Sequence, residues 1–445
     1  MTAGGAVVPL PTTARPWQAL GKIGRGVGLG TTPARLRMLL GGLVLVSLLW
    51  GAVAGWTVSS HASAANNIVT VSEPLSLDAQ QIYGALSDAD ATEAAAFLSG
   101  GLEPLSLRHR YQADIAVAAR ELEAATAAAG HSAAASRLAT LAAALPVYTG
   151  LVETARADNR LGLPLGAAYL REASAYMRAT LLPAARDLYA QENAQLAVAD
   201  QQATALPYIA VLVAVIAGLA LFFSQRWLAR RTHRMVNPGL LLASAASLAS
   251  VIWLISALAV AGSHLTAARD NGSAPVEALA RADIAVLRAH ADESLTLIDR
   301  SGDDSFQQDF VSLQRQLGPG PNTLLTAAAT AAANSPGSGL AAVAERDAHA
   351  WFAVHKVVRS LDDSGSYTAA VRLAVGRGHD SSRGSFLRLD SELTRAIGAD
   401  QAYFRTAAAA GQNDLAGLEA GLIALALVAA VSCARGVSRR LAEYR

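Results

Sequence analysis

Four long apolar segments are the strongest feature of the chain. They cover residues 38–58, 206–224, 239–261 and 416–433. The first three contain no charged residue, and the last contains one, Glu419. Each is close to the ~20 residues that a helix needs to cross the core of a bilayer. None shows the polar stripe of a surface helix in a soluble protein. The pattern therefore predicts four transmembrane helices.

Between these segments the periodicity is that of amphipathic helices. Apolar residues recur at spacings of three and four, as in the series Ile284, Leu287, Ala291, Leu295 and Ile298. No alternating pattern typical of a strand interrupts this periodicity. The regions 59–205 and 262–415 are therefore predicted to be helical throughout.

Short stretches rich in Gly, Pro, Asn and Ser, which break and cap helices, divide each of these regions. They lie at 99–104, 128–132, 159–164, 300–304, 334–339 and 362–366, with further interruptions at 318–321 and 376–384. Short connections join antiparallel neighbours, so each region is predicted to be an up-down four-helix bundle. The predicted fold class is an all-α integral membrane protein with four transmembrane helices and two tandem extracytoplasmic four-helix bundles.

Basic residues mark one side of the predicted membrane helices. Residues 1–37 carry five basic residues and no acid, and residues 225–238 carry four arginines and no acid. Residues 434–445 carry four arginines and one glutamate. Basic loops stay on the cytoplasmic side, so these parts are predicted to be a cytoplasmic N-terminal segment, loop and tail. We expect a multi-pass protein of the plasma membrane with both termini cytoplasmic.

The first apolar segment has a second interpretation. Ala62-Ser63-Ala64 resembles a signal-peptidase site, which would make residues 38–58 part of a cleaved signal peptide. The apolar part of a signal peptide is usually ~7–15 residues long, shorter than this segment. We therefore expect a retained membrane anchor.

The chain shows an internal duplication with a period near 200 residues. Ser72-Glu73-Pro74 resembles Ser273-Ala274-Pro275. Further on, Glu93 aligns with Glu293 among matching alanines. A period of this length predicts two copies of one module rather than a solenoid of small repeats.

The composition of the chain excludes several classes of protein and of binding site. Only 16% of residues are charged, against about 25% in soluble domains. The formal net charge of +1 gives no case for nucleic-acid binding. Cys433 is the single cysteine, which excludes an intramolecular disulfide and a cysteine-cluster metal site.

No enzyme motif is present in the sequence. The predicted cytoplasmic parts are too short for a kinase or ATPase domain, since domains rarely have fewer than ~50 residues. Residues 299–304 resemble the start of an EF-hand loop, but Gly and Glu are missing at the required positions. His349 and His355 are six residues apart, the wrong spacing for a shared metal face on a helix. We therefore expect neither an enzyme nor a cofactor or metal site.

Two groups of residues are candidates for contact with other molecules. At the predicted outer tips of the bundles, the candidates for binding a protein partner are Arg108, His109, Arg160, Asp303, Asp304, Asp362 and Asp363. Alternatively, these are ordinary capping and solvated residues. On the cytoplasmic side the candidates are Arg226, Arg230, Arg231 and Arg234. These arginines either dock a cytosolic partner or contact anionic lipid.

Two stretches carry a resemblance to a known family. Residues 145–189 and 351–376 resemble GlnX-type actinobacterial transmembrane proteins. The resemblance implies a non-enzymatic signal relay. Outside, the partner would be GlnH, a solute-binding lipoprotein for ligands of the aspartate and glutamate class. Inside, it would be protein kinase G, a Ser/Thr kinase contacted directly or indirectly, which controls nitrogen and 2-oxoglutarate metabolism.

Three other functions fit the predicted architecture. Helical bundles outside a membrane can sense a ligand directly, and tandem bundles can serve as an envelope scaffold. An accessory subunit of an amino-acid transporter is the third alternative. The loop 225–238 is too short for the coupling helix of a binding-protein-dependent permease. The predicted architecture, with two bundles outside and very little inside, favours a protein that receives a signal outside and depends on a second protein for its output.

Overall fold

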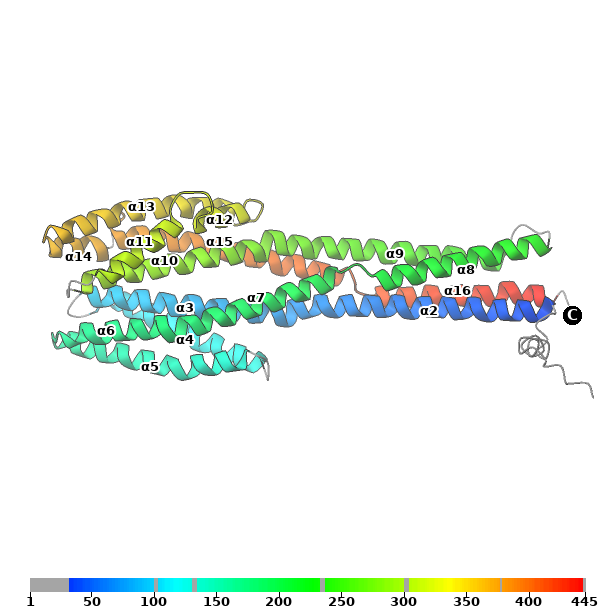
Figure 1. The fold of residues 1–445 in the computed structure, drawn as a ribbon, viewed down its shortest axis with the longest axis horizontal. Coiled ribbons are helices and arrows are strands. Elements are labelled where there is room, and N and C mark those ends of the chain that lie inside the picture. The colour runs from blue at the N-terminus through cyan, green and yellow to red at the C-terminus, as the bar shows by residue number, and fades with distance from the viewer. Residues whose placement is uncertain are drawn as a thin grey trace, which may run out of the picture. The chain divides into compact units, whose positions relative to one another are not determined.

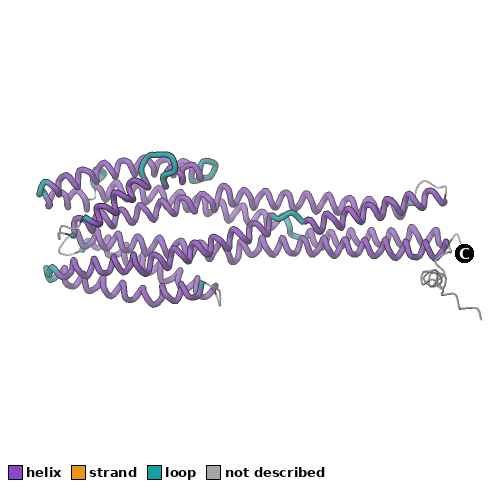
Figure 2. The backbone as a smooth tube through the Cα atoms, viewed as in Figure 1, coloured by secondary structure: helices purple, strands orange, loops and turns teal. Residues whose placement is uncertain are grey.

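The computed structural model describes residues 32–99, 103–129, 134–232, 237–299, 304–376 and 378–442. Within these ranges the regular elements are all helices, and no strand occurs (Figure 2). The prediction of an all-helical fold is thus confirmed for the described residues. The chain divides into two compact units. The first comprises Met1–Ser59, Leu206–Ala257 and Ala416–Arg445, and the second comprises Ser60–Ala205 and Leu258–Leu415.

Several helices are apolar and long enough to cross a membrane, which indicates a membrane protein. Five described stretches meet these criteria: Arg35–Leu98, Ala135–Arg160, Leu165–Arg230, Pro238–Ile298 and Ser382–Arg439. Four of them contain the apolar segments singled out in the sequence. The fifth, Ala135–Arg160, lies within the second unit, where Leu138, Leu141 and Tyr148 are buried in a core of helices.

The first unit contains parts of α2 (Thr32–Asn67) and α9 (Pro238–Ala268), together with α8 (Tyr208–Thr232) and α16 (Leu418–Ala442). One apolar cluster joins all four helices, through Leu43 of α2, Leu221 of α8, Leu240 of α9 and Ala429 of α16. The indole of Trp50 donates a hydrogen bond to Ser250 Oγ at 2.9 Å. Small side chains elsewhere in the contacts let the helices approach closely.

The helices α2 and α16 approach each other closely at Gly51. A Cβ added to Gly51 would lie 2.5 Å from Ala426 Cβ, which is too short for any real contact. We expect Gly51→Ala to destabilise the detergent-solubilised protein by about 1–3 kcal/mol through overpacking. Gly41→Ala on the same helix, where nothing lies within 4 Å, should be harmless in the same thermal-unfolding assay. Equal stability of the two variants would contradict this packing.

The second unit contains two helical modules, the first formed by residues 60–205 and the second by residues 258–415. After the end of α2, the first module consists of η1 (Ile68–Ser72), α3 (Glu73–Leu98), α4 (Leu105–Ala129), α5 (Ala135–Arg160), α6 (Leu165–Tyr176), η2 (Met177–Leu181) and α7 (Leu182–Thr204). After the end of α9, the second consists of η3 (Arg269–Ser273), α10 (Ala274–Ile298), α11 (Ser305–Leu317), α12 (Leu324–Ala331), α13 (Ser338–Asp363), α14 (Tyr367–Val375) and α15 (Ser382–Asn413).

Helices in both modules end where the sequence has its Gly- and Pro-rich breaks. The second module has more helices than four, because residues 318–321 separate α11 from α12 and residues 376–381 separate α14 from α15. The two modules pack on each other through α3 and α10, which lie side by side in Figure 1. They therefore form one compact unit rather than two independent bundles.

Three π-helical segments, η1, η2 and η3, interrupt the long helices of the second unit. Each is followed two residues later by a proline: Pro74, Pro183 and Pro275. Proline lacks the backbone N–H, and its ring clashes with the carbonyl four residues earlier in a regular α-helix. The wider π turn relieves this conflict without ending the helix. A proline inside a helix usually kinks it, and at Pro183 the π turn of η2 ends two residues earlier while the helix continues as α7.

Candidate functional site

The contact between the two modules carries an unusual amount of buried charge. The central helices α3 and α10 are covered on most sides, yet their buried residues include Asp90, Glu93, Asp292 and Glu293. Ionised carboxylates are stable in such places only when cations or hydrogen-bond donors compensate them. The arginines that do so here define the candidate functional site, which we call the inter-module charge network.

Arg110 of α4 connects the modules at one point of this network. Its guanidinium donates two hydrogen bonds to Asp88 of α3 and one to Asp390 of α15, all at 2.9 Å. Burial lowers the pKa of Arg110, but Asp88 and Asp390 outweigh this effect and raise it overall. Two further acids nearby, Asp114 and Asp283, have their pKa raised, first by burial and then by neighbouring carboxylates. One guanidinium thus compensates the negative charge of several carboxyl groups from both modules.

We expect Arg110→Gln to weaken the contact between the modules. The glutamine keeps a polar side chain but leaves Asp88 and Asp390 without their cation. Because Arg110 is partly exposed, the loss in unfolding free energy should be about 1–3 kcal/mol rather than the larger figure for fully buried pairs. Arg120→Gln, on the exposed side of the same helix, is the matched control. Hydrogen exchange of α3 and α10 measures the effect, and unchanged protection would contradict it.

Arg178 connects the modules at a second point. It lies in η2, and its Nη1 atom is 2.5 Å from Asp292 Oδ1 on α10. Its Nε atom is 4.0 Å from Asp90 Oδ2 on α3, which also accepts a hydrogen bond from Ser174. The Asp292 side chain is completely buried. Burial raises the pKa of Asp292 to about 6, even though Arg178 acts in the opposite direction.

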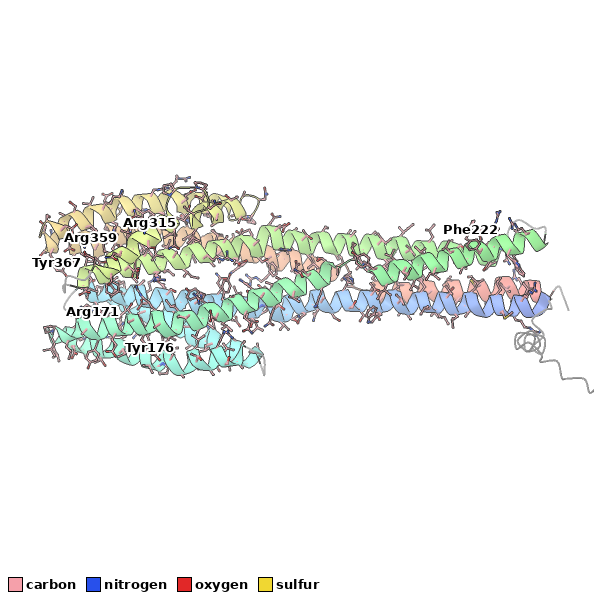
Figure 3. The ribbon with its side chains drawn as sticks, in the orientation of Figure 1. Arg171, Tyr176, Phe222, Arg315, Arg359 and Tyr367 are labelled. Atoms are coloured by element: carbon pink, nitrogen blue, oxygen red, sulfur yellow. The ribbon has the colours of Figure 1, made fainter. Side chains whose placement is uncertain are left out.

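Further contacts flank these two arginines. Arg171 of α6 donates to Asp299, at the ends of α3 and α10, with 3.0 Å between Nη1 and Oδ1. Figure 3 shows Arg171 from the first module and Tyr367 from the second at the same end of the two modules. An apolar cluster that includes Leu98 and Ile298 covers this end. Elsewhere along the interface the amides of Gln80 and Gln401 are hydrogen-bonded at 3.1 Å.

Each module also contains a buried cluster of polar side chains around one glutamate. The two glutamates, Glu93 and Glu293, occupy corresponding positions of the duplication. In the first module Glu93 forms a bidentate ion pair with the buried Arg156, whose guanidinium lies over the ring of Tyr111. In the second module Glu293 has no arginine. It accepts hydrogen bonds from the Ser382 hydroxyl at 2.7 Å and lies 2.9 Å from His355 Nδ1. The same position thus uses different partners in the two modules.

The pKa of Glu293 reflects these partners. Burial acts to raise it, but hydrogen bonds and charge from His290 and His355 outweigh burial and hold it well below its usual range. For Glu93, burial is the larger effect and raises the pKa against the influence of Arg156. The second module therefore holds an ionised carboxylate more firmly than the first.

The predicted tip residues lie at helix ends and are mostly on the surface. His109 and Arg160 are exposed, Arg108 is half-buried, and Asp304 is exposed at the start of α11. Asp362 and Asp363 both pair with Arg359 of their own helix at 2.6 Å, and Figure 3 shows Arg359 near the end of α13. Asp303 lies outside the described residues. Among the tip residues that the structure describes, no hydrogen bond or ion pair joins the set of the first module to that of the second. Their partner-binding role stays a prediction.

Three of the four predicted cytoplasmic arginines, Arg226, Arg230 and Arg231, belong to the end of α8. The side chains of Arg226 and Arg230 are exposed, and Arg231 lies within the helix. Arg234 is outside the described residues. A docking role or a lipid-contact role therefore stays a prediction for this group.

The residues of the charge network were not among the site residues predicted from the sequence. One feature of the sequence could have indicated them. Asp90 and Glu93 lie in an alanine-rich stretch that has no wholly polar face, so its acids cannot all point to solvent. Their partners could not be read from the sequence, because Arg110 and Asp390 are 280 residues apart. Among the described residues, no group of three or more His, Cys, Asp or Glu is arranged to hold a metal ion.

Comparison with known proteins adds one finding. Residues 64–202 match the family model of an actinobacterial sensor domain. This match covers almost all of the first module and about a third of the chain. No curated protein matches the sequence. The first module is thus similar to a domain that serves sensing in actinobacteria, and a sensing or signalling role is indicated for this membrane protein.

Proposed function

We propose that the protein is a non-enzymatic transmembrane signal relay. It receives amino-acid status, of the aspartate and glutamate class, from a GlnH-like solute-binding lipoprotein outside the cell. It passes this state, directly or indirectly, to a cytosolic kinase resembling protein kinase G that controls nitrogen and 2-oxoglutarate metabolism. The observation that carries a sensing role is the similarity of residues 64–202 to an actinobacterial sensor domain. The resemblance to GlnX-type proteins supports the identity of the partners.

The proposal includes a topology in the plasma membrane. Four helices would cross the membrane at 38–58, 206–224, 239–261 and 416–433, with both termini cytoplasmic and both modules outside. Two observations support it. Almost all of these residues lie in helices that are long and apolar enough to span a bilayer. With four crossings, the three basic segments 1–37, 225–238 and 434–445 would all lie on one side of the membrane, and the positive-inside rule assigns that side to the cytoplasm.

Continuous helices provide a physical route for the signal. The backbone is helical without a break from Arg35 to Leu98 and from Pro238 to Ile298. Each of these helices ends in a central helix of the charge network, α3 or α10. A partner that changes how α3 packs on α10 would therefore act on both apolar helices by rotation or sliding, a two-state transition of packed elements.

The proposal is tested by capture of the binding protein. Full-length protein in detergent is immobilised and mixed with the purified GlnH-like lipoprotein, with and without aspartate or glutamate. We expect capture that depends on the amino acid. A variant with Arg160 and His109 changed to Ala tests the outer ends, and Arg137→Ala, away from these ends on α5, is the matched control.

The outcomes separate the competing functions. Capture that needs the amino acid, and is lost in the variant but kept in the control, supports the relay and the outer ends as the contact. Absence of capture under every condition, from protein with an unchanged unfolding temperature, would overturn the relay. Direct ligand sensing, a scaffold or an accessory transporter subunit would then be the better interpretation.

A further inference from the structure

A small cavity lies between the two modules, beside the charge network. Its volume is about 110 Å³, roughly the space of three or four water molecules. The first module contributes α3, η2 and α7, and the second contributes α10. The residues that line it are Tyr83, Ser87, Asp90, Arg178, Leu182, Pro183, Arg186, Ile284, Arg288 and Ala291. A space of this size accepts a small organic molecule but no peptide.

The charges around the cavity are unbalanced. Three guanidinium groups line it, against the single carboxylate of Asp90. Arg178 is already paired with the buried Asp292. This leaves Arg186 from the first module and Arg288 from the second as the cations available to a ligand.

The two remaining arginines are only weakly engaged. Arg288 Nη2 is 3.7 Å from Asp309 Oδ2, which is beyond hydrogen-bond distance. Within the described part of the chain, Arg186 pairs with its neighbour Asp187 alone, with 3.1 Å between Nη2 and Oδ1. Both act on the same group, since each opposes the rise that burial causes in the pKa of the Tyr83 hydroxyl. The two arginines therefore line one cavity from different modules.

We propose that this cavity binds a small carboxylate molecule, held by Arg186 and Arg288 together. The planar guanidinium matches the two oxygens of a carboxylate and binds it with charge-assisted hydrogen bonds. Asp90 already accepts a hydrogen bond from Ser174 and lies 4.0 Å from Arg178, but it is the one carboxylate in the lining. A ligand that also carries an ammonium group, such as a free acidic amino acid, therefore fits this lining best. A ligand here would join the modules directly, because its two cations come from different modules.

This site goes beyond the proposed relay, in which a separate lipoprotein binds the amino acid. Calorimetric titration of the purified full-length protein, without any lipoprotein, tests it. The probes are L-aspartate, succinate, which lacks the ammonium group, and inorganic phosphate. We expect saturable binding of L-aspartate and weaker binding of succinate and phosphate. Failure of this titration leaves the relay standing, because the capture experiment depends on the lipoprotein instead.

Two variants locate the site. Arg288→Gln should weaken aspartate binding about tenfold or more, the scale of one charge-assisted hydrogen bond, and Arg186→Gln should act similarly. The Arg186 side chain is largely exposed and the Arg288 side chain about half exposed, so we expect both variants to fold. Arg281→Gln, on the same helix as Arg288 and paired with Glu277, is the matched control and should bind normally. Absence of saturable binding up to millimolar aspartate would overturn the proposal, as would equal affinity in all three variants.

Discussion

Replacing Arg178 with methionine should lower the unfolding free energy of the two-module unit by about 3–5 kcal/mol, the cost of removing one partner from a buried ion pair. The methionine fills a similar space, so the loss of stability comes from buried carboxylates that no longer have a cation and not from a cavity. Asp292 has no exposed surface and loses its cation at 2.5 Å. Asp90 loses the same cation at 4.0 Å. Denaturant unfolding of the purified protein, followed by circular dichroism, measures the effect.

Two further variants test the cause of this loss. Arg186→Met, eight residues after Arg178 on the exposed surface of α7, should change the unfolding free energy by no more than about 0.5 kcal/mol. Adding Asp292→Asn to Arg178→Met should recover part of the loss, because the uncompensated charge is removed. If Arg178→Met were as stable as the wild type, Arg178 would not compensate buried charge.

Replacing Glu293 with alanine should have a comparable effect, also about 3–5 kcal/mol at neutral pH. The change removes the acceptor of the Ser382 hydroxyl and of the Trp351 indole, whose Nε1 atom is 3.4 Å from Glu293 Oε2. It also removes the partner of His355 in the same core. Glu277→Ala, on the exposed part of α10, is the matched control and should cost no more than about 0.5 kcal/mol.

The loss at Glu293 should depend on pH in a defined direction. The pKa of the folded carboxyl is below its ordinary value of 4.5. The ionised carboxylate therefore contributes its full stability above pH 4.5, and this contribution disappears as the pH falls below that value. The difference between wild type and Glu293→Ala should be largest near pH 7 and should shrink at pH 3.5. A difference that grows on acidification would show that the carboxyl is protonated in the folded protein.

The helices themselves could be predicted well from the sequence. Spacings of three and four gave the series from Ile284 to Ile298, which lies within α10. The Gly- and Pro-rich breaks coincide with helix ends because these residues cannot continue a regular helix. The π turns before Pro74, Pro183 and Pro275 could not be predicted, since proline indicates a disturbance of the helix but not its form.

The candidate site was less predictable, for a physical reason. Periodicity identifies the buried face of a helix, but it does not identify the partner across that face. In α3 the same stripe of small residues and acids would fit a solvated surface or a charged interface equally well. Asp88 pairs with Arg110 in the same module, whereas Asp390 reaches the same arginine from the second module. Only the packing of α3 on α10 distinguishes these cases.

The central claim is that the two modules act as one sensing unit, whose internal packing changes with the signal. Spin labels at Thr140 of α5 and His349 of α13, both exposed, report the distance between the modules in a Cys433→Ser background. The full-length protein in lipid nanodiscs is measured with bound lipoprotein, with and without aspartate. We expect the distance distribution to shift only in the presence of the amino acid. An unchanged distribution in a sample where binding is complete would contradict the account.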